Sequence, residues 1–157
     1  MSDRILVIDF GSQFTQMIAR RVRDLEVYCE LLPWSASPEQ MLTPETRGVI
    51  LSGGPNSVYA PDAPQIPDPI INSGLPILGI CYGMQALTHK LGGVVSPSEH
   101  HEYGQTQIEV LVPNKLLSEP EMTVLMSHGD RIIQPPAGWR VIARSTNSPV
   151  AAMADFV

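Results

Sequence analysis

Four short apolar segments, rich in β-branched residues, recur along the first half of the chain, with helix-forming segments between them. Uninterrupted apolar runs of this length predict strands buried on both faces, because a strand with one exposed face would alternate apolar and polar residues. The predicted strands cover residues 4–9, 27–32, 47–52 and 76–80. Their alternation with helices is typical of an α/β fold with an open, mostly parallel sheet and helices on both faces.

The helices between these strands are predicted from apolar residues that repeat with the period of an α-helix. The clearest covers residues 13–25, where the apolar side chains form one stripe and Ser12 is the predicted N-cap. Shorter helices are predicted at residues 35–42 and 66–73, and another at residues 82–91. The first half of the chain should therefore place a helix layer on each side of the sheet.

The second half of the chain has a different pattern. Residues 105–112 alternate polar and apolar side chains, as an antiparallel strand with one exposed face does. Residues 123–126 and 140–143 are predicted as further short strands, and residues 150–154 as the start of another. We therefore expect a small antiparallel extension, within a single domain of 157 residues that has no internal repeat.

Composition narrows the class of protein. With 43% hydrophobic and 17% charged residues, the chain is typical of a soluble globular protein, and no apolar segment is long enough to cross a membrane. A net charge of −6 without a basic stripe argues against nucleic acid as the main partner. The two cysteines, Cys29 and Cys81, fit a reducing cytoplasm better than a disulfide framework.

The sequence G-I-C-Y-G at residues 79–83 joins the fourth predicted strand to the helix that follows it. A nucleophile at such a junction lies on a sharp turn that lifts its side chain clear of the sheet, as in the G-x-S-x-G elbow. The helix beginning after Cys81 also directs N–H groups at the sulfur, which favours the reactive thiolate. The alternative is a cysteine buried at the end of a strand, as most free cysteines are.

A cysteine that attacks an acyl carbon needs hydrogen-bond donors for the oxyanion. The backbone N–H of Tyr82, directly after Cys81, is the expected first donor, and the glycine pair Gly53-Gly54 could supply the second. The loop at residues 52–57 also approximates the S-G-G-x-D-S loop with which ATP pyrophosphatases bind phosphate. That alternative is weakened by Pro55, which removes one backbone donor.

Histidines are the candidates for the base. His89 is too far along its helix to reach Cys81, and we expect it to be exposed. The sequence H-H-E at residues 100–102 lies in a predicted polar loop with no third ligand group, so we expect no metal there. His128, in the sequence S-H-G-D at residues 127–130, is either a base or part of a structural turn lining the pocket.

Four motifs in this order resemble those of the class I glutamine amidotransferases. They are V-I-D-F-G-S-Q at residues 7–13, L-S-G-G-P at 51–55, G-I-C-Y-G-M-Q at 79–85 and M-S-H-G-D at 126–130. The resemblance covers essentially the whole chain and implies the three-layer, flavodoxin-like fold of this family. The first and last motifs favour the glutaminase domains that precede an ATP-pyrophosphatase domain over the anthranilate and carbamoyl-phosphate relatives.

The resemblance implies a role for individual residues. Cys81 would attack the side-chain amide of L-glutamine, release ammonia and leave a γ-glutamyl thioester, with Gly54 and Tyr82 as the oxyanion donors. His128 would be a pocket residue and not the base. The residues that it implies for substrate binding are Gln85, Ser127, Gly129 and Asp130.

The resemblance also implies partners. Ammonia would pass to an ATP-pyrophosphatase domain that uses ATP and magnesium, in a homodimeric parent, whereas this domain would hold no cofactor or metal. The catalytic His and Glu of the family lie in an F-H-P-E motif beyond the region equivalent to residues 151–154, and the sequence does not contain it. We therefore expect a glutaminase domain that is incomplete at its carboxyl end, lacks the ATP-pyrophosphatase and dimerisation domains, and is inactive or very weak.

Two other functions are compatible with the sequence. One is a non-catalytic glutamine-binding or docking module that regulates a synthetase, and the other is a different cysteine hydrolase built on the same elbow. Replacement of Gln85 would separate them, because only a glutamine site should then lose affinity for glutamine.

Overall fold

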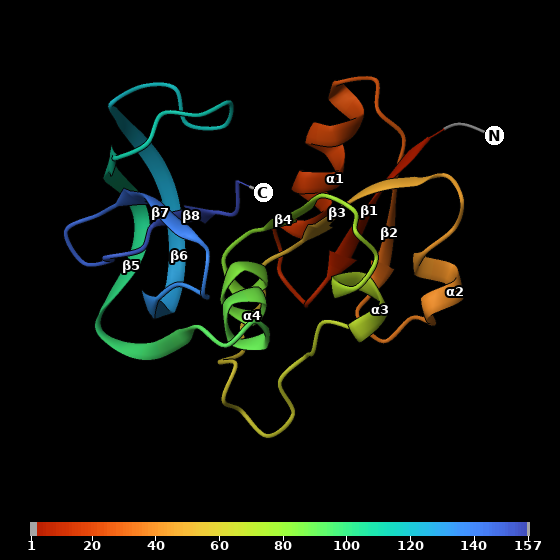
Figure 1. Cartoon of the computed structure of the whole chain (residues 1–157), viewed down its shortest axis with the longest axis horizontal. Coiled ribbons are helices and arrows are strands. Elements are labelled where there is room, and N and C mark those ends of the chain that lie inside the picture. The colour runs from red at the N-terminus through yellow and green to blue at the C-terminus, as the bar shows by residue number, and fades with distance from the viewer. Residues whose placement is uncertain (1–2, 157) are drawn as a thin grey trace. The chain divides into compact units, whose positions relative to one another are not determined.

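The computed structural model describes residues 3–156, apart from the side chains of His100 and His101. Within these residues the chain forms two compact units, one that ends at Leu87 and one that begins at Thr88 (Figure 1). The first unit contains a parallel sheet and the second an antiparallel sheet. The division falls inside a helix, so no Pro-rich, Gly-rich or Ser-rich segment marks it in the sequence.

The parallel sheet of the first unit has four strands in the order β2-β1-β3-β4. The strands are β1 (Arg4–Asp9), β2 (Cys29–Pro33), β3 (Thr46–Leu51) and β4 (Ile77–Gly79). All three neighbouring pairs are parallel, so the carboxyl ends of the strands meet at one edge of the sheet. The predicted parallel sheet is confirmed, and each predicted strand of the first half is present with small changes at its ends.

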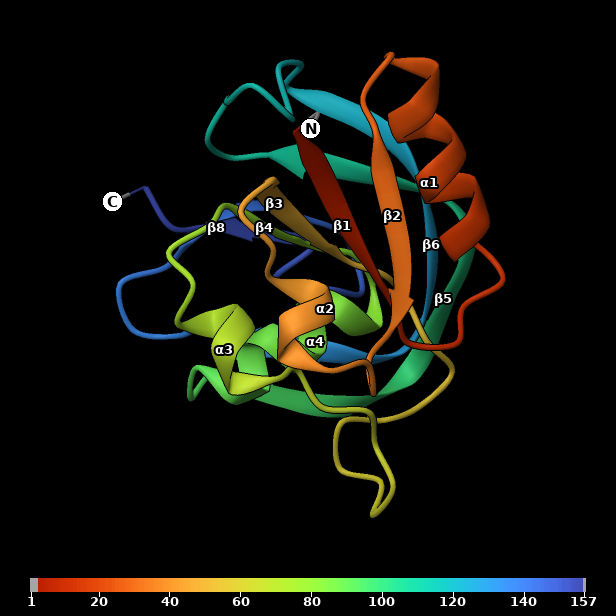
Figure 2. The same ribbon diagram turned by 90° about the vertical axis from the view of Figure 1, so that its right-hand side faces the viewer.

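Helices cover both faces of this sheet, as predicted. They are α1 (Thr15–Asp24), α2 (Pro38–Met41), α3 (Asp68–Ile71) and α4 (Tyr82–Lys90). α1 lies on one face, where Ala19 packs with Val7 and Cys29, and α2 and α3 lie on the other (Figure 2). Successive side chains of β1 point to opposite faces of the sheet. Because helices cover both faces, Leu6, Val7 and Ile8 are all fully buried.

The ends of α1 differ from the prediction. Ser12 is not the N-cap, because Phe14 occupies that position and the helix begins two residues later than expected. The Ser12 hydroxyl instead accepts the Phe14 N–H at 3.0 Å, and its carbonyl accepts the Thr15 N–H at 3.3 Å. These two bonds form a turn, so the chain between β1 and α1 takes more residues than a simple cap requires.

The second unit is an antiparallel sheet in the order β6-β5-β7-β8. The strands are β5 (Val94–Val110), β6 (Glu121–Gln134), β7 (Arg140–Arg144) and β8 (Ala152–Ala154). Ile108, Val110 and Ala143 form its apolar cluster. The predicted antiparallel part is confirmed, but β5 and β6 extend well beyond the predicted segments because their pairing continues through polar residues.

Two local predictions for this unit are wrong. Residues 100–102 were expected in a loop and lie in β5, and residues 128–130 were expected in a turn and lie in β6. Cross-strand pairing continues through these polar residues, since Glu102 pairs with His128 and Pro97 pairs with Asp130. Residues 98–101 of β5 lie in the irregularity between these two pairs.

Candidate functional site

The carboxyl ends of β1, β3 and β4 bring three sequence-predicted segments together in the first unit. Asp9 ends β1, Ser52 and the glycine pair follow β3, and Cys81 follows β4. Gly53 lies directly against the nucleophile candidate, because a Cβ atom built on it would be 3.4 Å from the Cys81 Cβ. Parallel sheets bind ligands beyond the carboxyl ends of their strands, so this edge is the expected place for a site.

Cys81 lies on a sharp turn between β4 and α4. Its φ of 51° is in the left-handed region, which is uncommon for a residue with a side chain and is characteristic of strained functional positions. The flanking glycines make the turn possible. A Cβ on Gly79 would lie 2.8 Å from the Met84 Cα, and one on Gly83 would lie 2.3 Å from the Leu51 carbonyl oxygen.

The two backbone donors predicted for an oxyanion are available. In the part of the chain that the structure describes, neither the Gly54 N–H nor the Tyr82 N–H takes part in a backbone hydrogen bond. Gly54 also lies very close to β1, since a Cβ on it would be 2.6 Å from the Phe10 carbonyl oxygen. Cys81 is partly exposed.

The side chain of Tyr82 anchors the start of α4. Its hydroxyl donates to the Pro64 carbonyl at 2.6 Å, and its ring packs against Phe10 with centroids 5.4 Å apart. Burial raises the pKa of the Tyr82 phenol, so the hydroxyl stays protonated and serves as a donor. The side chain thus fixes the position of the Tyr82 backbone, which is the part that the sequence assigned to the site.

Gln85 follows Cys81 by one turn of α4. Its backbone N–H donates to the Cys81 carbonyl at 3.1 Å, and its side chain is buried. The structure thus places a buried polar side chain one turn from Cys81, and the role of Gln85 in positioning a substrate stays a prediction. His89 lies farther along α4 and is exposed, as expected from its place in the sequence.

The other predicted substrate residues belong to the second unit. Ser127, Gly129 and Asp130 lie on β6, where Ser127 is exposed and the other two are partly buried. Between them, the His128 Nε2 is 3.3 Å from a carboxylate oxygen of Glu102.

Glu102 is a buried polar residue that the sequence patterns did not predict. It is 5% exposed, and its second carboxylate oxygen accepts the Ser145 hydroxyl at 2.7 Å. No local signal identifies it, because its partners lie 26 and 43 residues away in the chain.

Neither Cys29 nor Cys81 is in a disulfide bond, and their surroundings differ. Cys29 is 1% exposed and its Sγ donates to the Ala19 carbonyl at 3.4 Å, whereas Cys81 is partly exposed. Among the residues described, no group of three or more His, Cys, Asp or Glu side chains is arranged to hold a metal ion.

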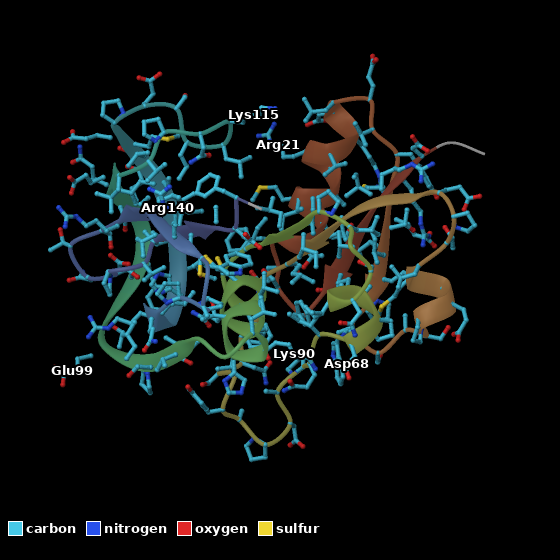
Figure 3. The ribbon with its side chains drawn as sticks, in the orientation of Figure 1. Arg21, Asp68, Lys90, Glu99, Lys115 and Arg140 are labelled. Atoms are coloured by element: carbon cyan, nitrogen blue, oxygen red, sulfur yellow. The ribbon has the colours of Figure 1, made fainter. Side chains whose placement is uncertain are left out.

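Two of the charged side chains labelled in Figure 3, Arg21 on α1 and Asp68 at the start of α3, are exposed on the first unit. A search of the described helices found none with the length and apolar character that a membrane crossing requires.

Comparison with known proteins gives a consistent picture. The family model for "Glutamine amidotransferase class-I" matches residues 6–155. The GMP synthase (glutamine-hydrolyzing) of Thermomicrobium roseum is 51% identical over 154 residues, and that of Xylella fastidiosa is 45% identical over 158 residues. These matches cover 97% and 96% of this chain but only 29% and 30% of the relatives, so the chain spans less than a third of their length.

Solved structures share the fold. A protein from Thermoplasma acidophilum that was assigned as a GMP synthase subunit superposes with a TM-score of 0.84 at 27% identity, covering 100% of this chain and 80% of that one. A glutamine amidotransferase from Thermotoga maritima gives a TM-score of 0.71 at 21% identity, covering 98% of this chain and 72% of that one. Both confirm the combination of a parallel sheet with an antiparallel sheet.

Proposed function

The chain belongs to the class I glutamine amidotransferases, and we propose that within this family it is the glutamine-hydrolysing domain of a GMP synthase. The observation that carries the proposal is the strained turn at Cys81, held against the glycine pair after β3. A left-handed cysteine between a strand and a helix, beside unpaired backbone donors, is the arrangement that acyl transfer to a thiolate needs.

The first half of the reaction forms an acyl enzyme. The Cys81 thiolate attacks the side-chain amide carbon of glutamine, a C–S bond forms, and the carbonyl electron pair moves onto oxygen. The backbone N–H groups of Gly54 and Tyr82 stabilise this oxyanion. Collapse of the intermediate breaks the C–N bond, and the nitrogen takes up a proton and leaves as ammonia. Water then cleaves the γ-glutamyl thioester to give glutamate and the free thiol.

Substrate-binding roles are proposed for Gln85 on α4 and for Ser127, Gly129 and Asp130 on β6. Gln85, buried beside the nucleophile on α4, contacts the glutamine molecule. The backbone around Ser127 and Gly129 supplies further hydrogen bonds, and Asp130 faces the substrate's amino group. These roles follow from the four motifs, and each is open to substitution.

A general base is also required, and the F-H-P-E motif that holds it in this family is not among the 157 residues. General acid–base catalysis contributes about 10²–10⁴-fold in rate. We therefore expect the 157-residue polypeptide to form covalent adducts at Cys81 but to release ammonia very slowly.

The ammonia serves a second domain in this proposal. An ATP-pyrophosphatase domain uses ATP and magnesium to aminate XMP to GMP in purine nucleotide biosynthesis, and the parent enzyme is a homodimer. The support is that the matched relatives are named GMP synthases and are about three times as long as the matched segment. Two cysteines that form no disulfide are consistent with a cytoplasmic location.

Covalent labelling tests the proposed function. A chloroketone analogue of glutamine should alkylate Cys81, and peptide mass spectrometry should find no label on Cys29, which is buried. Excess glutamine should slow the labelling, and Cys81→Ser should abolish it.

Two other results of the labelling experiment would contradict different parts of the proposal. Label on Cys29 in place of Cys81 would contradict the assignment of the nucleophile. Calorimetric binding of glutamine by a chain that the chloroketone never modifies would instead indicate a non-catalytic binding module.

A further inference from the structure

We infer that Ser52 and Thr15 are positioning residues for the reaction, because their hydroxyl groups orient the Gly53–Gly54 peptide so that the Gly54 N–H serves as an oxyanion donor. The inference rests on the proposed function, since it explains how one of the two donors is aimed. Neither residue was singled out for chemistry by the sequence, and neither is expected to touch the substrate.

The key contact involves the peptide unit itself. The Ser52 hydroxyl donates to the Gly53 carbonyl oxygen at 3.0 Å, and Ser52 is fully buried. The Gly53–Gly54 peptide is trans, so its C=O and its N–H point in opposite directions. A hydrogen bond that holds the Gly53 carbonyl toward Ser52 therefore directs the Gly54 N–H away from Ser52.

Buried neighbours hold the Ser52 hydroxyl in place. Its oxygen accepts the Phe10 N–H at 3.2 Å and the Thr15 hydroxyl at 3.0 Å. The single Thr15 proton is shared with the Asp9 carboxylate at 2.9 Å, and the same carboxylate oxygen accepts the Gly11 N–H at 2.8 Å. Thr15 is 1% exposed, so water does not compete for these bonds. This network of hydrogen bonds joins the end of β1 to the start of α1 and to the end of β3.

Ser52 is also tied to the nucleophile turn. Its carbonyl accepts the Gly83 N–H at 3.0 Å, and Gly53 lies against the Cys81 Cβ. One residue thus anchors both the turn that carries the donor and the helix start that follows the thiol. If the Gly53–Gly54 peptide flipped, it would present a carbonyl oxygen where a donor is needed, which would repel the developing anion.

A buried hydroxyl can also be purely structural, and Thr46 provides the matched control. It is 3% exposed, its hydroxyl donates to the Met41 carbonyl at 3.2 Å, and it accepts the Arg4 Nε–H at 3.0 Å. Thr46 begins β3, whereas Ser52 follows its other end. Thr46→Val and Thr15→Val remove the same group from comparable surroundings, so a general loss of stability affects both.

The test uses 2-amino-4-cyanobutanoic acid, a glutamine analogue with a nitrile in place of the amide, labelled with ¹³C at the nitrile carbon. The Cys81 sulfur adds to that carbon, one C≡N electron pair moves onto nitrogen, and water supplies the proton that completes a thioimidate. NMR titration of the 157-residue chain gives the Kd of this adduct, which depends on the oxyanion donors. The rate of alkylation by iodoacetamide is measured in parallel, because that displacement needs no oxyanion donor.

We expect Ser52→Ala and Thr15→Val to weaken the adduct by at least about tenfold, since the loss of one such donor costs about 10²–10³-fold in rate and small displacements cost similar factors. Their rates of alkylation by iodoacetamide should stay within about twofold of the wild-type rate, because this displacement forms no oxyanion. Thr15→Ser, which keeps the hydroxyl, should restore the Kd, and Thr46→Val should leave it unchanged.

The possible outcomes distinguish a failure of this inference from a failure of the proposed function. Adduct formation that is equally strong in the wild type, Ser52→Ala and Thr15→Val would overturn the inference and leave the proposed function standing. Equal weakening by Thr46→Val would show that the effect is a general loss of stability and would overturn it too. A wild-type chain that reacts with iodoacetamide but never with the nitrile would contradict the proposed function and this inference together.

Discussion

At the scale of single residues, Cys81 and Glu26 share a backbone conformation but differ in its cause. They are the non-glycine residues with positive φ among those described, at 51° for Cys81 and 61° for Glu26. Glu26 directly follows the C-cap of α1 and is exposed, where a left-handed residue commonly ends a helix. Cys81 has the same conformation where a strand meets a helix, and there it lifts a thiol out of the sheet.

Gly83, two residues after Cys81, sets how closely α4 can approach the end of β3. Gly83→Ala would place a methyl group 2.3 Å from the Leu51 carbonyl oxygen, and neither backbone can move alone because the Gly83 N–H also bonds to Ser52. We expect a loss of at least about 2 kcal/mol in the free energy of unfolding, in the range for an overpacked core. Urea denaturation measures it, and labelling of Cys81 should slow in the same variant.

Gly48→Ala is the control for this prediction. Its new methyl group would meet the flexible end of Ile5 at 3.3 Å, and alanine suits a strand better than glycine. The change should therefore cost less than about 1 kcal/mol. A Gly83→Ala protein as stable as Gly48→Ala would show that α4 does not pack against the end of β3 as described.

At the scale of secondary-structure elements, a buried arginine joins the strands of the parallel sheet at the end opposite Cys81. Arg4 is 6% exposed and starts β1. Its guanidinium donates to the Thr46 hydroxyl, to the Glu30 carboxylate, and to the Gln40 and Met41 carbonyls. One side chain thus connects β1, β2, β3 and the end of α2.

Loss of this side chain should destabilise the first unit strongly. Arg4→Met keeps much of the side-chain volume but removes the guanidinium donor from Glu30 and from the Gln40 carbonyl, whereas the Met41 carbonyl keeps the Thr46 hydroxyl as a donor. Breaking a buried ion pair costs about 3–5 kcal/mol, and partial exposure of Glu30 lowers the expected loss to about 2–4 kcal/mol. The midpoint of urea unfolding checks this value.

Arg47→Met is the control for this prediction, because it removes the same positive charge at an exposed site and so tests whether the charge alone matters. Arg47 pairs with Asp3 at 3.0 Å, but both side chains are more than half exposed. Exposed pairs contribute about 0–1 kcal/mol, so this variant should unfold close to the wild type. Equal losses in the two variants would mean that the net charge, and not the buried contacts, determines stability.

At the scale of the whole molecule, each unit contains one sheet, and the edges of the sheets are the places that open most easily. In the first unit β1 and β3 lie inside the sheet, whereas β4 is a strand of three residues at its edge. Leu78 on β4 is 39% exposed, in contrast to the fully buried Leu6 on β1. Local opening needs fewer broken contacts at such an edge.

Amide hydrogen exchange tests this expectation with two hydrogen bonds of similar length. The Ser52 N–H donates to the Ile8 carbonyl at 3.0 Å inside the sheet, and the Ile80 N–H donates to the Leu51 carbonyl at 2.9 Å beside β4. The Ile80 amide should exchange at least about tenfold faster, because opening at the edge costs less free energy. Equal exchange rates in NMR would indicate that β4 is protected by a further pairing.

Local sequence patterns determined most of the elements. Apolar runs and helical periodicity predicted the four parallel strands and α1 to within a few residues, and the glycines around Cys81 predicted the strained turn. These features depend on neighbours within one or two turns of chain, so the sequence specifies them directly. The order of the motifs also identified the family that the comparisons then showed.

Tertiary structure decided the rest, because the decisive contacts join residues that are distant in the chain. The partners of Arg4 lie up to 42 residues away, and the contact between Thr15 and Ser52 spans 37 residues. The length of β5 and β6 likewise depends on cross-strand pairing through polar residues, which no periodic pattern announces. The sequence by itself specified which residue is the proposed nucleophile, whereas only folding brought the buried hydroxyl groups of Thr15 and Ser52 together beside the Gly53–Gly54 peptide.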